Sequence, residues 1–147
     1  MQHLDPSHAS YQQLLIHQPA KQWQAESELI HNEEYSEKQP IFTLVIPIHN
    51  QESFLKRQVE SVFSHTLGSF EIIFILDGCR DNSKAILLET VKASPKPEQL
   101  TSITIFENQD GMFETSADNL GFTKARGGVL VEIQADMEML TLGYNLK

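Results

Sequence analysis

The chain has 147 residues, of which 40% are hydrophobic, so it is long enough to bury one core and short enough to form a single domain. Asp and Glu number 20 against 11 Lys and Arg, and the net charge of −9 would repel a phosphate backbone. We therefore do not expect nucleic-acid binding as the main activity. Cys79 is the single cysteine, which excludes an intramolecular disulfide and a cysteine-rich zinc site and favours a reducing, cytoplasmic setting.

No targeting signal is visible in the sequence itself. The first residues, "MQHLDPSHASYQQLL", lack both the basic region and the apolar region of a secretory signal. The longest apolar run, "IIFIL" at 72–76, is too short to span a bilayer. We therefore expect no transmembrane segment within these residues.

Residues 1–40 differ in composition from the rest of the chain. They contain seven Gln and four His, with six acidic and two basic residues, and end in the polar stretch "EEYSEKQP". The sequence predicts an N-terminal extension and linker here, in which Tyr11, Leu14 and Leu15, with Trp23 and Leu29, can form one side of a helix. Because the four histidines lack paired spacing, we expect solvated side chains rather than a metal site.

From residue 41 to 147 the pattern predicts one domain of alternating strands and helices. We expect strands at 42–48, 70–76, 102–108 and 129–134, and helices at 52–66, 83–91 and 116–128. The strands are near-continuous apolar runs, as in parallel sheets that are buried on both faces. Strands that alternate with helices imply right-handed crossovers and a largely parallel α/β sheet.

Each helix is expected to turn an apolar side toward the sheet. The residues predicted to point inward are Phe54, Leu55, Val59, Val62 and Phe63 in the first helix, and Ala85, Leu88 and Val91 in the second. Asp81 or Asn82 is available as the N-cap of the second helix.

Polar residues follow three of the four predicted strands. Ligands of an open parallel sheet bind outside the carboxyl ends of its strands. The polar groups found there are His49 and Asn50, then Asp77 and Asp81, and finally Asp136 and Glu138. Carboxylate oxygens suit Mg²⁺ or Mn²⁺, which in turn can hold a phosphate. The sequence contains neither GxGxxG nor GxxxxGK[ST], which argues against a dinucleotide fold and a P-loop.

Two segments resemble the nucleotide-binding half of family 2 glycosyltransferases of the GT-A fold. They are "FTLVIPIHNQESFLKRQVESVFSHTLGSFEIIFILDGCRDNS" and "NLGFTKARGGVLVEIQADM", and the resemblance covers residues 42–146. It implies a three-layer α/β/α, Rossmann-like domain with a mostly parallel sheet, which would be incomplete in this chain. It also implies transfer of a sugar from a nucleotide donor to an acceptor, with a metal ion neutralising the leaving diphosphate.

The resemblance assigns roles to particular residues. Pro47, His49 and Asn50 stand in the segment that holds the nucleoside, and Asp77 matches an acid that contacts the base. The Asn-Leu-Gly helix of the family is kept at 119–121. Asp136 matches the metal-contacting acid of the Asp-x-Asp motif, so the implied cofactor is Mg²⁺ or Mn²⁺.

The chain departs from the family pattern at four of these positions. His49 replaces a usual Tyr, and its ring can still stack on a base over a smaller area. Leu76 and Gln134 each stand where the family has an acid, and Asp118 stands where an Arg is common. These changes leave open a degenerate transferase or a non-catalytic binding module that binds the nucleotide-sugar without turnover.

The sequence stops eleven residues after Asp136, where the family continues into an acceptor-binding half. The general base is therefore not in this sequence, and we expect a piece of a longer enzyme rather than a half-domain. The predicted function is metal-assisted, inverting sugar transfer from a nucleotide-diphospho-sugar to a glycan, lipid or protein. The expected location is cytoplasmic, with a peripheral membrane association left open.

Simpler roles compete with each functional one. Asp77 can shape its turn, Asp136 and Glu138 can be solvated acids, and His49 can merely close a strand. Arg80 beside Cys79 would favour a thiolate, yet an inert small residue is the better interpretation of Cys79. Arg80 itself is expected to be an exposed turn residue rather than a phosphate ligand.

Overall fold

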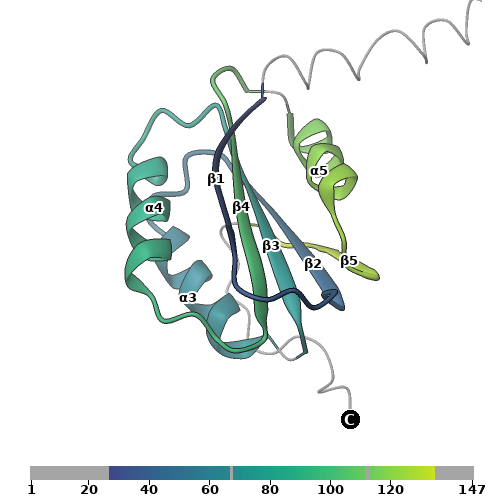
Figure 1. The fold of residues 1–147 in the computed structure, drawn as a ribbon. Coiled ribbons are helices and arrows are strands. Elements are labelled where there is room, and N and C mark those ends of the chain that lie inside the picture. Colours follow the sequence, from purple (N-terminus) through teal and green to yellow (C-terminus); the bar gives the residue numbers. More distant parts are fainter. Residues whose placement is uncertain (1–26, 67, 112, 135–147) are drawn as a thin grey trace, which may run out of the picture.

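The computed structural model describes residues 27–66, 68–111 and 113–134, and it shows a five-stranded sheet between layers of helices. Figure 1 shows helices on both faces of this sheet. The elements are β1 (Ser27–Glu34), β2 (Phe42–Ile48), α3 (Leu55–His65), β3 (Phe70–Asp77), α4 (Ser83–Ala93), β4 (Leu100–Asn108), α5 (Phe113–Lys124) and β5 (Val129–Glu132). The strand order is β1-β4-β3-β2-β5.

Parallel pairing of β2 and β3 forms the centre of the sheet. Phe42 lies opposite Phe70, and the register continues without a break to Ile48 opposite Leu76. Every residue of β3 is buried, as its apolar run predicts. β4 and β5 add to the two sides in parallel, which confirms the predicted largely parallel α/β sheet.

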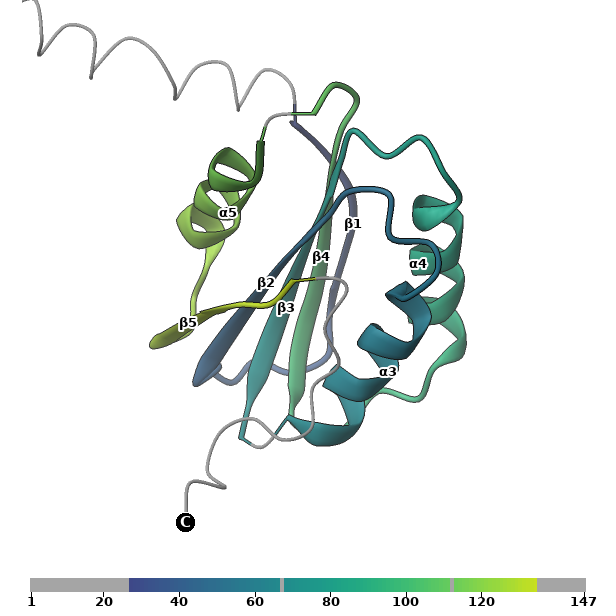
Figure 2. The same ribbon diagram turned by 180° about the vertical axis from the view of Figure 1, so that it is seen from behind.

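Two hydrophobic clusters lie on opposite faces of the sheet. One contains even-numbered residues of β2 and β3, such as Leu44 and Phe74, with side chains from α3 and α4. The other contains Val45, Ile73 and Ile75 with residues of α5. Figure 2, from behind, shows the same division of helices between the two faces. Odd-numbered residues of β2 and β3 therefore face α5.

The predicted inward side of α3 is confirmed except at its first residue. Leu55, Val59, Val62 and Phe63 are buried. Phe54 is 49% exposed, because the helix begins one residue later and Phe54 precedes its first turn.

The predicted inward side of α4 is wrong at two of three positions. Val91 is buried, whereas Ala85 and Leu88 are exposed. Ser83, Leu87, Thr90 and Val91 are the buried residues of this helix. Ser83 and Thr90, which are small and polar, share the inner side with Leu87. A prediction from apolar residues alone therefore turned the wrong side of α4 toward the sheet.

β1 corrects the predicted extension and linker. Residues 27–34 pair antiparallel with β4, from Ser27 opposite Asn108 to Glu34 opposite Ser102. Leu29, predicted on one side of a helix, lies in this strand and is 52% exposed. The strand is an edge strand with a mostly exposed, polar sequence, and such a strand carries little hydrophobic signal. The helix predicted around Tyr11 lies outside the described residues.

An ion pair between a buried carboxylate and a partly exposed guanidinium joins the segment after α5 to the sheet. Glu71 of β3 is 2% exposed, and its carboxylate accepts hydrogen bonds from the backbone N–H of Arg126 at 2.6 Å and from its Nε at 3.0 Å. The Thr43 hydroxyl also donates to Glu71 at 2.6 Å. Hydrogen bonding with Glu71 raises the pKa of Arg126 above its ordinary value. This pair fixes where β5 begins.

Arg126→Ala tests that pair. The substitution removes the counter-charge and the Nε hydrogen bond of the buried Glu71 carboxylate but keeps the bonds from Thr43 and the backbone, so we expect the free energy of unfolding to fall by about 2 kcal/mol. The measurement is urea unfolding followed by circular dichroism. Lys124→Ala removes an exposed positive charge nearby and should change stability little. Equal effects of the two substitutions would contradict a stabilising role of the Glu71–Arg126 pair.

Candidate functional site

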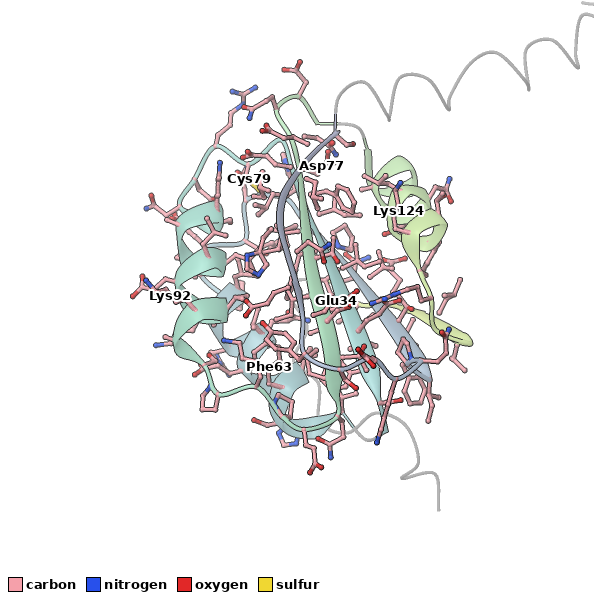
Figure 3. All side chains as sticks on the ribbon, viewed as in Figure 1. Glu34, Phe63, Asp77, Cys79, Lys92 and Lys124 are labelled. Carbon is pink, nitrogen blue, oxygen red and sulfur yellow. The ribbon has the colours of Figure 1, made fainter. Side chains whose placement is uncertain are left out.

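The carboxyl ends of β2, β3 and β4 bring His49, Asp77 and Asn108 to one edge of the sheet. Asp77 pairs with Asn108 in the parallel register, and His49 follows Ile48, the last residue of β2. Figure 3 shows Asp77 and Cys79 at this end of the sheet and Phe63 near the other. Because these positions belong to the odd-numbered side of β2 and β3, the polar group lies on the α5 side.

The His49 ring is held in one orientation by two neighbours. Its Nδ1 lies 2.7 Å from the backbone carbonyl oxygen of Asp77, which can only accept, so Nδ1 carries the proton. In the neutral ring Nε2 is then an acceptor, and the Asn50 amide nitrogen lies 3.4 Å from it. Asn50 is itself fixed, because its Oδ1 accepts from the backbone N–H of Arg80 at 2.8 Å. His49 thus presents an exposed ring in a defined pose.

Asn50 reaches this position through an uncommon backbone conformation. Its φ is +51°, in the left-handed region that Asn tolerates better than most residues. This bend lets the Asn50 side chain contact the turn after β3. His49 and Asn50 therefore adopt a defined loop conformation and are not a frayed strand end.

The Asp77 carboxylate is buried and fixed from the neighbouring strand. Asp77 is 6% exposed, and its Oδ1 accepts from the Asn108 side-chain amide at 3.2 Å. The Asn108 backbone carbonyl accepts from Gly78 N–H at 2.8 Å. Sequence reasoning missed Asn108, although the rule that selects strand ends applies to β4 as well.

Gly78 allows the turn after β3 to pack against the turn after β4. Its φ is +63°, and a Cβ added there would lie 2.7 Å from the Gly111 nitrogen. A larger residue would therefore push apart the two turns that carry Asp77 and Asn108.

The carboxylates of Asp81 and Glu52 tie the loop before α3 to the N-terminus of α4. Asp81 Oδ1 accepts from Ser83 N–H at 2.9 Å, and Oδ2 accepts from Glu52 N–H at 3.2 Å. Glu52 Oε2 in turn accepts from Asn82 N–H at 3.1 Å. Asn82 is the N-cap residue by position but makes no capping bond with its side chain, so of the two predicted caps Asp81 does the capping.

Cys79 is a half-buried thiol at the same edge. Burial, with the charges of Asp81 and Asp77 adding to it, raises the pKa of the Cys79 thiol. Its Sγ–H donates to the Ile48 carbonyl at 3.3 Å. This environment matches the expected inert residue and not a thiolate. Arg80 is exposed, as expected.

The Asn-Leu-Gly segment is a packing feature of α5. Leu120 is 4% exposed in the core, and Asn119 is exposed. A Cβ on Gly121 would lie 2.4 Å from Val45 Cγ1, so only glycine allows α5 to approach β2 this closely. Asp118, which stands where an Arg is common in the family, is 9% exposed.

The predicted metal ligand cannot be placed. Asp136 and Glu138 lie outside the described residues, while Gln134 is exposed and donates to Glu132 Oε1 at 2.9 Å. Within residues 27–66, 68–111 and 113–134, no three His, Cys, Asp or Glu side chains gather as a metal site.

A comparison with protein families identifies the family to which the chain belongs. The family described as Glycosyl transferase family 2 matches residues 43–141, which include β2 except its first residue, all elements from α3 to β5, and His49, Asp77 and Asn108. The chain belongs to this family. No helix in the described part of this family 2 chain is long and apolar enough to cross a bilayer.

Curated relatives of the chain are named as glycosyltransferases. An undecaprenyl-phosphate 4-deoxy-4-formamido-L-arabinose transferase of Pseudomonas savastanoi is 28% identical over 99 residues, which are 65% of this chain and 28% of the relative. Glycosyltransferase GlyG of Streptococcus pneumoniae is 28% identical over 96 residues, 65% of this chain and 30% of GlyG. The chain thus spans less than a third of either relative.

Solved structures share the fold. Mannosyltransferase PcManGT from Pyrobaculum calidifontis, in complex with GDP-Man and Mn²⁺, superposes with a TM-score of 0.62 at 15% identity, covering 71% of this chain and 30% of that one. S. aureus TarS 1-349 in complex with UDP gives a TM-score of 0.54 at 15% identity, covering 65% and 27%. These likenesses confirm the expected GT-A fold.

The structure brings three of the predicted nucleotide-binding residues together. His49, Asn50 and Asp77 form one connected hydrogen-bonded group. Pro47 lies one residue from the end of β2, opposite Ile75, and is half-buried on the α5 side. Their binding roles stay predictions.

Asp81→Asn tests the capping of α4 and the tie between α4 and the loop before α3. Hydrogen bonds from Ser83 and Glu52 outweigh burial and lower the pKa of Asp81 from its ordinary 3.8. Ionised Asp81 therefore stabilises the fold above about pH 4, and this contribution disappears as the pH falls below it. We expect the variant to lose about 1 kcal/mol at pH 7 in urea unfolding.

The pH dependence supplies the control. The stability difference between the original chain and Asp81→Asn should shrink on acidification, whereas Asp110→Asn, at an exposed turn position, should show little difference at any pH. A difference that stayed constant down to pH 3 would contradict the role of the ionised carboxylate.

Proposed function

We propose that this chain forms the donor-binding part of a glycosyltransferase that moves a sugar from a nucleotide-diphospho-sugar to an acceptor. The observation that carries the proposal is the connected group of His49, Asn50 and Asp77 at the carboxyl edge of β2 and β3. Family membership and the fold shared with sugar transferases support it. TarS and PcManGT were solved with UDP and GDP-Man, which indicates the class of donor.

Each residue of the group has a distinct proposed role toward the nucleotide. The exposed His49 ring offers a flat surface on which the base can stack. Asp77 provides a carboxylate acceptor for N–H groups of the base, and because Asn108 fixes it, little ordering is needed on binding. Asn50 holds the His49 ring in its orientation, and Pro47 of β2 lines the nucleotide site.

The diphosphate is proposed to lie toward the end of β5 and not at the N-terminus of α4. A free helix N-terminus attracts phosphate, but that of α4 already holds the carboxylates of Asp81 and Glu52. Gln134 follows β5, and Asp136 comes two residues later. A carboxylate there is a suitable ligand for Mg²⁺ or Mn²⁺, and the Mn²⁺ in the PcManGT complex supports this choice.

When bound, the metal would neutralise charge on the leaving diphosphate. Asp136 would hold it, with Gln134 as a neutral neighbour in place of an acid. Sugar transfer is proposed to invert the anomeric carbon, by direct displacement of the diphosphate by the acceptor hydroxyl.

The acceptor is proposed to be a glycan, a lipid or a protein. Several relatives are named for undecaprenyl phosphate, which favours a lipid acceptor and work at a membrane surface from the cytoplasmic side. The comparison with TarS and PcManGT adds nothing on the acceptor beyond the shared fold.

Calorimetric titration with UDP, GDP and dTDP, with and without Mn²⁺, tests the proposal directly. We expect one of these nucleotides to bind the 147-residue chain with a clear preference over the others. Binding to none of them, in a chain shown to be folded by circular dichroism, would overturn the proposed function.

Substitution of the base-contacting residues should weaken binding even without metal. We expect Asp77→Ala to lower nucleotide affinity about tenfold or more, because a hydrogen bond with a charged group is lost. His49→Ala should lower it less, by about threefold to tenfold, and His49→Phe should restore it through stacking. Unchanged affinity in both alanine variants would place the base elsewhere.

Asp136→Ala should have a different signature. The variant should bind nucleotide in EDTA as well as the original chain does, but gain no affinity when Mn²⁺ is added. Asp110→Ala, which removes an acid from another turn, is the control and should keep the metal effect. A full Mn²⁺ effect in Asp136→Ala would contradict the assignment of this residue.

A further inference from the structure

The N-terminal strand β1 contacts Asn108, at the carboxyl end of β4, through the side chain of Ser27. Ser27 lies opposite Asn108 in the antiparallel pairing, and its Oγ lies 2.5 Å from Asn108 Oδ1. Asn108 is 1% exposed, so water has little access to compete for this bond. The contact joins residues that are 81 positions apart in the chain.

The order of donors and acceptors in this contact is fixed by chemistry. An ionised carboxylate only accepts, so Asn108 must turn its NH₂ toward Asp77, where the distance to Oδ1 is 3.2 Å. Its carbonyl oxygen then faces Ser27, whose hydroxyl is the donor. A flipped Asn108 amide would set its oxygen against the Asp77 carboxylate and lose that bond, although the Ser27 hydroxyl could then accept from the NH₂ group.

We infer that Ser27 is a positioning residue for the proposed nucleotide site, acting through Asn108 on the Asp77 carboxylate. The inference rests on the proposed function and extends it to a strand that precedes residues 43–141, the part matched by the family. Ser27 does not touch the nucleotide. Its hydroxyl holds the Asn108 amide in the orientation that the Asp77 carboxylate requires, and so keeps Asp77 in place to accept from the base.

The same two strands provide a matched control. Thr104 Oγ1 of β4 donates to Asn32 Oδ1 of β1 at 3.4 Å, a polar cross-strand contact on the same face but farther from Asp77. Asn32→Ala and Ser27→Ala each remove one such contact between β1 and β4. Any effect of loosening the edge strand itself should appear in both variants.

The experiment measures nucleotide affinity and Asn108 side-chain NMR signals in the 147-residue chain. The probe is whichever of UDP, GDP and dTDP binds the unsubstituted chain most tightly. We expect Ser27→Ala to weaken its binding about threefold to tenfold, Ser27→Thr to restore it, and Asn32→Ala to leave it unchanged. The Asn108 side-chain NH₂ protons should exchange with water faster in Ser27→Ala alone.

A double-substitution cycle separates positioning from general stability. In an Asp77→Ala background, Ser27→Ala should have no further effect on affinity, because the group that it positions is gone. Equal affinity of Ser27→Ala and the original chain, or an equal loss in the Asp77→Ala background, would overturn the inference. Absence of nucleotide binding by the original chain would overturn the proposed site and the binding role of Ser27, while unchanged Asn108 exchange would overturn the orienting role by itself.

Discussion

The parallel pairing of β2 with β3 is the constraint on which the rest of the structure depends. Its register sets Ile48 beside Leu76, so the residues that follow the two strands emerge side by side. His49 can then donate to the Asp77 carbonyl, and Asn50 can reach the backbone of Arg80. A shift of one residue would turn these side chains to the other face, because side chains alternate along a strand.

The two faces of the sheet serve different purposes at this edge. On the face of α3 and α4, the carboxylates of Asp81 and Glu52 occupy the N-terminus of α4 and tie it to the loop before α3. On the α5 face lie His49, Asp77 and Asn108, while Gly121 lets α5 pack closely on Val45. The division explains why a bound diphosphate is expected toward β5. It also explains why the Glu71–Arg126 pair matters, since this pair anchors the segment that enters β5.

Sequence patterns predicted the central strands well because their burial leaves a continuous apolar run, as in β3. They missed β1 because an exposed edge strand such as "SELIHNEE" has no such run. Its pairing with β4 joins segments far apart in the sequence, which local patterns do not reveal. The position of Asp77 followed from the strand-end rule, but its link to Asn108 and Ser27 depends on register across three strands. The shared capping by Asp81 and Glu52 likewise needs two loops that only the fold brings together. Asp136 lies outside the described residues, so its role stays a prediction.

The central claim is that a nucleoside diphosphate binds at the carboxyl edge of β2 and β3. The most direct test is a ¹H–¹⁵N NMR titration of the chain with UDP and GDP, following each backbone amide. The account predicts the largest shifts at Ile48 to Asn50 and at Asp77 to Arg80, with small shifts at the opposite end of the sheet near Phe63. Shifts that cluster away from the β2 and β3 carboxyl ends, or no shifts with either nucleotide, would contradict it.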